Sequence, residues 1–111
     1  MAEAPSQPPQ LSDEARRAAL AKAAAVRRER AELKVRLKAG EVSLESLIGR
    51  ADTDDVVGKM KVLAVLESLP GVGKVKARRT MEEVGIADSR RLRGLGDQQR
   101  AALLAAFPHR S

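Results

Sequence analysis

The sequence has no cysteine, tryptophan or tyrosine, and its 111 residues include one phenylalanine and one histidine. The missing cysteines exclude disulfide bonds, thiol catalysis and cysteine metal sites, and they leave the redox compartment open. A single histidine, His109, does not build a histidine metal cluster. With so few aromatic rings, the chain has no platform on which single-stranded bases could stack. We therefore expect no metal and no cofactor.

Long apolar stretches are also missing. The sequence contains no run of about 18 apolar residues that would span a bilayer, and its first residues lack the apolar core of a signal peptide. Asp52, Asp54 and Asp55 stand where acids precede a helix, and no histidine joins them as a catalytic partner. We expect a cytoplasmic protein that is not an enzyme, with no small-molecule substrate and no membrane attachment.

Basic residues are in excess, with 21 Lys and Arg against 15 Asp and Glu, a formal charge of +6. Such a charge favours a polyanionic partner, and nucleic acid is the leading candidate. Residues 1–40 carry nine basic and five acidic side chains, 41–70 carry three and six, and 71–111 carry nine and four. The net charge along the chain is therefore +4, −3 and +5. The two basic regions either join into one patch after folding or form two surfaces.

The N-terminal third divides into a tail and a helix. Three of the five prolines lie in residues 1–10, and little apolar surface is available there, so we expect a disordered tail over 1–11. Residues 12–40 predict one long basic, alanine-rich helix, capped by Ser12 and ended by Gly40. Its narrow apolar stripe is formed by Ala15, Ala19, Val26, Leu33 and Leu37, and the large residues of this stripe all lie in the second half. Only that half is expected to dock firmly.

One arc of this helix is basic. Arg16, Arg27, Lys34 and Lys38 fall within about 40° of one another on a wheel of 100° per residue, and we call these four residues the basic arc. They predict a second DNA surface on the helix. The alternative is that they form only the solvated side of an amphipathic helix.

The remainder, 41–107, predicts a small helical domain, followed by a C-terminal tail over 108–111. No stretch shows sustained alternation of apolar and polar residues, so the predicted fold class is all-α. Caps and stops predict four helices in this domain: Ser43 to about Ala51, Asp55 to Leu69 as a central buried helix, Lys74 to Val84 followed by Gly85, and a last helix capped by Asp97 and stopped by Pro108.

The sharpest local motif is Gly71-Val72-Gly73-Lys74, with Lys76 close behind, and we call residues 71–73 the glycine turn. After the apolar Leu69 and before a new helix, it resembles a helix-hairpin-helix. Glycines let such a turn approach a phosphate closely, while backbone N–H groups and the positive helix end face the anion. The alternative is a plain tight turn between two helices.

A second motif is the run 90–96, which we call the arginine segment. Arg90, Arg91 and Arg93 are three arginines in four residues, followed by two glycines. Arginine forks onto phosphate oxygens or a guanine edge, and glycines let a chain lie close to a duplex. We expect an extended loop that follows a DNA groove, the alternative being a solvated charged loop.

Together these motifs resemble the actinobacterial integration host factor family of nucleoid-associated proteins. The resemblance spans about 11–107 and is carried by Met60-Lys-Val, the run 69–77, the arginine segment with Gln99-Arg100, and Phe107. It implies a long helix packed on a helix-two-turns-helix domain like that of ribosomal protein S13. It also implies sequence-tolerant binding of duplex DNA on the nucleoid, with bending, bridging or compaction, in support of site-specific recombination.

The resemblance assigns residues as well. The glycine turn with Lys74 would take the phosphate backbone, and Arg90, Arg91 and Arg93 would make the arginine contacts. We expect double-stranded DNA as the partner of a protein that is monomeric in solution, with self-association on DNA left open. Two alternatives remain, an S13-like RNA-binding protein of ribosomal context and a non-catalytic helical adaptor for acidic partners.

Overall fold

The computed structural model describes residues 12–108, and every regular element in that range is a helix. The all-α prediction is confirmed. The predicted tail at 1–11 and residues 109–111 lie outside the described range. Within it, no helix is both long enough and apolar enough to cross a bilayer. The elements are α1 (Asp13–Ala39), α2 (Leu44–Arg50), α3 (Asp55–Gly58), α4 (Val62–Glu67), α5 (Lys74–Val84), the 3-10 turn η1 (Leu92–Gly94) and α6 (Asp97–Ala106).

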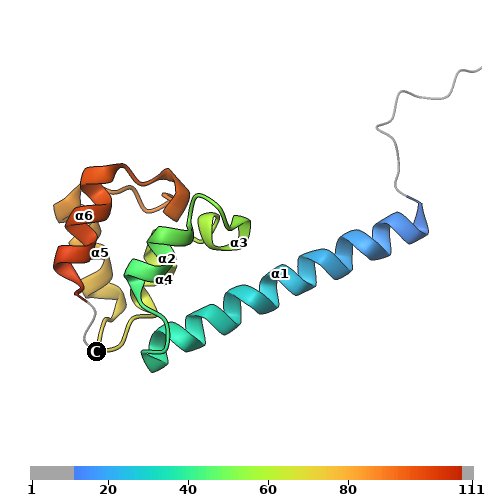
Figure 1. Cartoon of the computed structure of the whole chain (residues 1–111), viewed down its shortest axis with the longest axis horizontal. Coiled ribbons are helices and arrows are strands. Elements are labelled where there is room, and N and C mark those ends of the chain that lie inside the picture. Colours follow the sequence, from blue (N-terminus) through green and yellow to red (C-terminus); the bar gives the residue numbers. More distant parts are fainter. Residues whose placement is uncertain (1–11, 109–111) are drawn as a thin grey trace, which may run out of the picture.

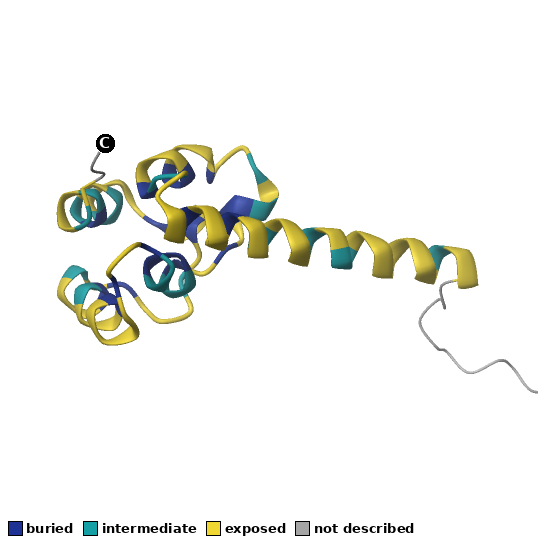
Figure 2. Ribbon diagram, turned by 90° about the horizontal axis from the view of Figure 1, so that it is seen from below, coloured by how far each residue is buried: buried dark blue, intermediate teal, exposed yellow. Residues whose placement is uncertain are grey.

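Helix α1 begins and ends where the sequence predicts. The Ser12 hydroxyl accepts a hydrogen bond from the Ala15 N–H at 3.0 Å, and Gly40 ends the helix in the left-handed conformation at φ 78°. Only Leu33 and Leu37 are buried in α1. The N-terminal part therefore projects from the rest of the molecule (Figures 1 and 2). The radius of gyration is 18.3 Å, against about 13 Å for a compact chain of 100 residues.

Helices α2 to α6 form a C-terminal cluster around one apolar core (Figure 2). No charged or polar residue of the described chain is buried in this core, so its stability comes from apolar burial. Its largest fully buried side chains are Leu37, Leu47, Met60, Leu66, Met81, Leu92, Leu103, Val57, Val62 and Val65. Because Leu37 is among them, the end of α1 is part of the same core.

The predicted central helix from Asp55 to Leu69 is wrong. Helix α3 ends at Gly58 and α4 begins at Val62, because the backbone between them pairs with the arginine segment. The Leu92 N–H donates to the Met60 carbonyl at 3.0 Å, and the Val62 N–H donates to the Arg90 carbonyl at 2.9 Å. Residues 59–61 thus form a break, in which the carbonyls of Lys59 and Met60 accept hydrogen bonds from the distant Arg91 side chain and Leu92 N–H.

Two details of the arginine segment also differ from the sequence predictions. It contains the turn η1, so it is compact and not an extended loop. The N-cap of α6 is Gly96, not Asp97, because the Gln99 Oε1 accepts a hydrogen bond from the Gly96 N–H at 3.0 Å and closes the first turn. In contrast, the end of α5 is confirmed, with Gly85 at φ 85° and the Ile86 N–H bonded to the Met81 carbonyl at 2.8 Å.

Gly58 lies where α2, α3 and the arginine segment meet. A Cβ at this position would stand 2.3 Å from the Ala51 carbonyl oxygen and 2.9 Å from the Arg93 Nε. The Arg93 Nε itself donates to the Ala51 carbonyl at 3.3 Å. The missing side chain of Gly58 is therefore what lets the Arg93 guanidinium reach the end of α2.

We expect Gly58→Ala to destabilise the protein by about 1–3 kcal/mol, the usual range for overpacking a tight site. Either the Ala51 backbone must shift or the Arg93 contact must be lost. The control is Gly49→Ala in α2, where a Cβ would meet no described atom within 4 Å. Urea unfolding measures both variants, and an equal or higher stability of Gly58→Ala would contradict the packing described here.

Candidate nucleic-acid interface

The glycine turn is anchored in the core by Val72, and its two glycines are exposed. Gly71 takes the left-handed conformation at φ 74°, whereas Gly73 has an ordinary φ of −96° and is the N-cap of α5. The Val72 side chain is buried at 7% exposure, and its N–H donates to the Leu69 carbonyl at 3.2 Å. Val72 is thus an anchor for the turn, and the two glycines present its outer surface.

The start of α5 offers donors and positive charge to an anion. No side chain caps this helix. Its first turn lies wholly within the described residues and contains no acid. The first-turn N–H groups and the helix dipole therefore face outward beside the exposed Lys74 and Lys76. The Lys76 Nζ lies 5.8 Å from the centre of the Phe107 ring, which places this ammonium group over the end of α6. Sequence reasoning expected the lysines here but not the aromatic contact.

The three predicted arginines fold back onto the chain in different ways. The Arg90 Nη1 donates to the Gly94 carbonyl at 2.6 Å, and the Arg91 Nη1 donates to the Lys59 carbonyl at 3.0 Å. The Arg93 Nη2 donates to the Asp55 Oδ1 at 2.7 Å, in addition to its bond to the end of α2. Of these three arginines, Arg93 therefore makes the most hydrogen bonds within the fold.

Two acids of the middle segment, Asp52 and Asp55, are paired with arginines from the C-terminal part. The hydrogen bond from Arg93 lowers the pKa of Asp55, and the hydrogen bond from Arg100, at 3.0 Å, lowers the pKa of Asp52 and raises that of Arg100. The pKa of Asp54 is lowered first by the Val57 N–H, because Asp54 caps α3. Two of the six acids of residues 41–70 are thus offset by arginines of the C-terminal part.

On another face, cations from three parts of the chain surround one hollow of about 150 Å³. We call it the basic hollow, and it is lined by Arg30 and Lys34 of α1, Lys59, Met60 and Lys61 of the break, Ala64 of α4, and Arg91 of the arginine segment. Lys34 belongs to the basic arc, so the two basic regions of the sequence meet here.

The other members of the basic arc do not line the hollow. Arg16 and Arg27 are exposed on the projecting part of α1, and Lys38 is exposed near its C-terminal end. Sequence reasoning missed Lys59 and Lys61, because they stand in a segment whose net charge is negative. The Met60-Lys-Val motif marked their position, but no local signal showed that Arg91 pairs beside them.

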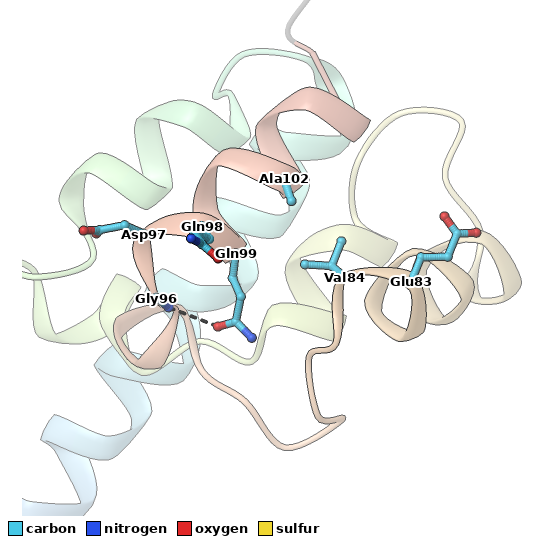
Figure 3. A pocket seen from close by; sticks show the side chains of 7 residues that line it. All are labelled: Glu83, Val84, Gly96, Asp97, Gln98, Gln99 and Ala102. Carbon is cyan, nitrogen blue, oxygen red and sulfur yellow. Dashed lines mark hydrogen bonds between the residues drawn. The ribbon is translucent and has the colours of Figure 1, made fainter.

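A larger hollow of about 740 Å³ lies between the end of α5 and the start of α6 (Figure 3). Its lining carries the carboxylates Glu83 and Asp97, with the amides of Gln98 and Gln99 and no cation among the described lining residues. Such a lining repels phosphate. Within residues 12–108, no group of three or more histidine, cysteine or acidic side chains is placed to hold a metal ion.

The pairing of Asp52 and Asp55 predicts how stability depends on pH. Both pKa values are lowered in the folded protein, so the stability that the pairs supply is present above the unfolded pKa of about 3.9 and is lost as the pH falls through the lower folded values. We expect the wild type to be more stable than Asp52→Asn/Asp55→Asn at pH 6, with the two urea midpoints converging below pH 4. Midpoints that stay equally far apart from pH 6 to pH 2.5 would contradict this.

Comparison with known proteins gives concordant matches. The model of the S13-like H2TH domain matches residues 37–107. Integration host factor of Mycolicibacterium smegmatis is 64% identical over 99 residues, which cover 89% of this chain and 94% of the relative. The corresponding identity is 63% for integration host factor of Mycobacterium tuberculosis, over 89% of this chain and 94% of the relative. It is 59% for that of Streptomyces coelicolor, over 89% of this chain and 92% of the relative.

A solved structure agrees with these sequence relatives. The structure of sIHF bound to an 8bp palindromic DNA superimposes with a TM-score of 0.75 at 59% identity, covering 78% of this chain and 97% of the other. The resemblance seen in the sequence is confirmed, and so is the helix-two-turns-helix fold. The chain belongs to the integration host factor family of actinobacteria, whose C-terminal part is an S13-like H2TH domain.

Proposed function

We propose that this protein binds duplex DNA and shapes it as an architectural protein of the nucleoid. The observation that carries the proposal is the solved sIHF structure, a 59% identical relative bound to palindromic DNA and covered over 97% of its length. The chain's own surface supports it, because the exposed glycine turn and the lysines beside it suit phosphate oxygens. No catalytic step enters this function, and its chemistry is binding alone.

The chain divides into two functional parts in this proposal. The domain over 41–107 binds the duplex, with Gly71, Gly73, Lys74 and Lys76 at the backbone, and with Arg90 and Arg91 from the arginine segment. Arg93 acts mainly through the fold, because its guanidinium already bonds Asp55 and the end of α2.

The helix over 12–40 adds a second DNA surface. Arg16, Arg27, Lys34 and Lys38 are exposed on α1, and the helix from the first to the last of them is about 33 Å long at about 1.5 Å per residue. A helix that projects from its domain reaches DNA beyond the segment the domain holds. This geometry favours bending, bridging or compaction of DNA, and through them the support of site-specific recombination.

Binding should be dominated by phosphate contacts and therefore depend strongly on salt. We expect the logarithm of the association constant to fall by about 0.9 per neutralised phosphate against the logarithm of the salt concentration. Fluorescence anisotropy with a short duplex measures the slope, and a scrambled duplex should give nearly the same affinity. Structured RNA of equal length is the comparison, and a strong preference for RNA would favour the ribosomal S13-like alternative.

Gly73→Glu tests the glycine turn. The conformation at Gly73 suits any residue, and a Cβ there would meet no described atom within 4 Å, so the variant should keep its thermal stability. A carboxylate in front of the α5 N-terminus would nevertheless repel phosphate. Loss of a charged hydrogen bond costs about 1.5–3 kcal/mol, which predicts at least about tenfold weaker duplex binding.

The matched control is Gly49→Glu in α2, which adds the same charge where space is equally open. Equal losses in Gly73→Glu and Gly49→Glu would show that only net charge matters. The glycine turn would then be a plain turn between helices.

A further inference from the structure

We propose that the basic hollow is a phosphate-binding site, and that a phosphate held in it ties α1 to the C-terminal cluster. The site brings together side chains from α1, from the break between α3 and α4, and from the arginine segment. These parts are distant in the sequence. A ligand in the hollow would therefore contact both functional parts of the chain at once.

One cation of the hollow, Arg91, is held in place by hydrogen bonding to the backbone. The Arg91 Nη1 is fixed on the Lys59 carbonyl at 3.0 Å, and the backbones of Lys61 and Arg91 lie opposite each other in an isolated antiparallel bridge. One of the five N–H donors of the Arg91 guanidinium is used in this way. The guanidinium therefore stands beside the hollow in a fixed place.

The charge of the hollow has no internal counterpart. None of its five cations forms an ion pair with any carboxylate of residues 12–108. Asp55 feels the positive charge of Lys59, but its carboxylate is bonded to Arg93. An anion placed among Arg30, Lys34, Lys59, Lys61 and Arg91 would therefore meet positive charge that no described carboxylate neutralises through an ion pair.

Size and chemistry indicate a phosphate. The hollow of about 150 Å³ is several times the roughly 30 Å³ of one water molecule, so it has room for a phosphate group or a short condensed phosphate. Arginine forks onto such an oxyanion, while lysines act as point charges around it. The phosphate comes either from the backbone of a bound duplex or from a free condensed phosphate. The first source deepens the proposed function and rests on it, whereas the second does not.

The experiment compares two double variants that lose equal charge. Arg30→Gln/Lys61→Gln, the hollow variant, removes one cation of α1 and one of the break from the hollow, and it leaves the basic arc intact. Lys22→Gln/Arg79→Gln removes one exposed cation from α1 and one from α5, both outside it. For wild type and both variants, we would measure duplex affinity against salt and thermal unfolding with and without inorganic pyrophosphate. Circular dichroism confirms that each variant is folded.

For a phosphate of the duplex, we expect the hollow variant to bind DNA at least about tenfold more weakly than the control, with a salt slope lower by about 0.9 per lost contact. For a free phosphate, we expect pyrophosphate at about five times its Kd to raise the Tm of the wild type and the control by roughly 4–8 °C, and not that of the hollow variant. Either result supports the site and identifies the source.

Two outcomes would overturn the proposal. One is that the hollow variant and the control are indistinguishable in both assays while the wild type binds duplex. The proposed function would then stand, and the hollow would contribute only general positive charge. The other is that polyglutamate raises the Tm as pyrophosphate does, and loses this effect in the hollow variant. The hollow would then accept carboxylates and serve an acidic protein partner. If no form of the protein binds duplex, the proposed function fails separately, and the pyrophosphate assay still decides the site.

Discussion

The pairing of the arginine segment with the break at 59–61 is the constraint on which the rest of the structure depends. Two backbone hydrogen bonds, at Met60 and Val62, hold these distant segments together. They end α3, set the start of α4 and direct Leu92 into the core. The absence of a side chain at Gly58 is part of the same constraint, because the Arg93 guanidinium passes over it to the end of α2.

This pairing also decides the distribution of charge. Arg93 and Arg100 cross to the acids Asp55 and Asp52, so positive and negative groups offset each other on that side. Arg91 instead stands among lysines and faces α1. One segment therefore supplies both the ion pairs that hold the cluster and a cation of the surface that we propose for phosphate. Arginines that lie close together in the sequence have different roles because they contact different residues in the folded chain.

Helix α1 shows how little docking a long helix needs. Only Leu33 and Leu37 are buried, and the alanine-rich remainder is held by intrinsic helix propensity and by its caps. Alanine gives the helix no large apolar side chain to bury, so its N-terminal part extends outward with the basic arc exposed. The same composition that leaves this part of the helix undocked on the C-terminal cluster leaves its cations exposed.

The ends of α1 and α5, the all-α class and the docking of the second half of α1 were predictable from the sequence, because caps, left-handed glycines and apolar spacing act between residues a few positions apart. The glycine turn and the three arginines could be located for the same reason. The break within 55–69, the basic hollow and the role of Arg93 could not. They depend on hydrogen bonds and charges between segments more than 25 residues apart, and only tertiary packing decides which carbonyl or carboxylate an arginine meets.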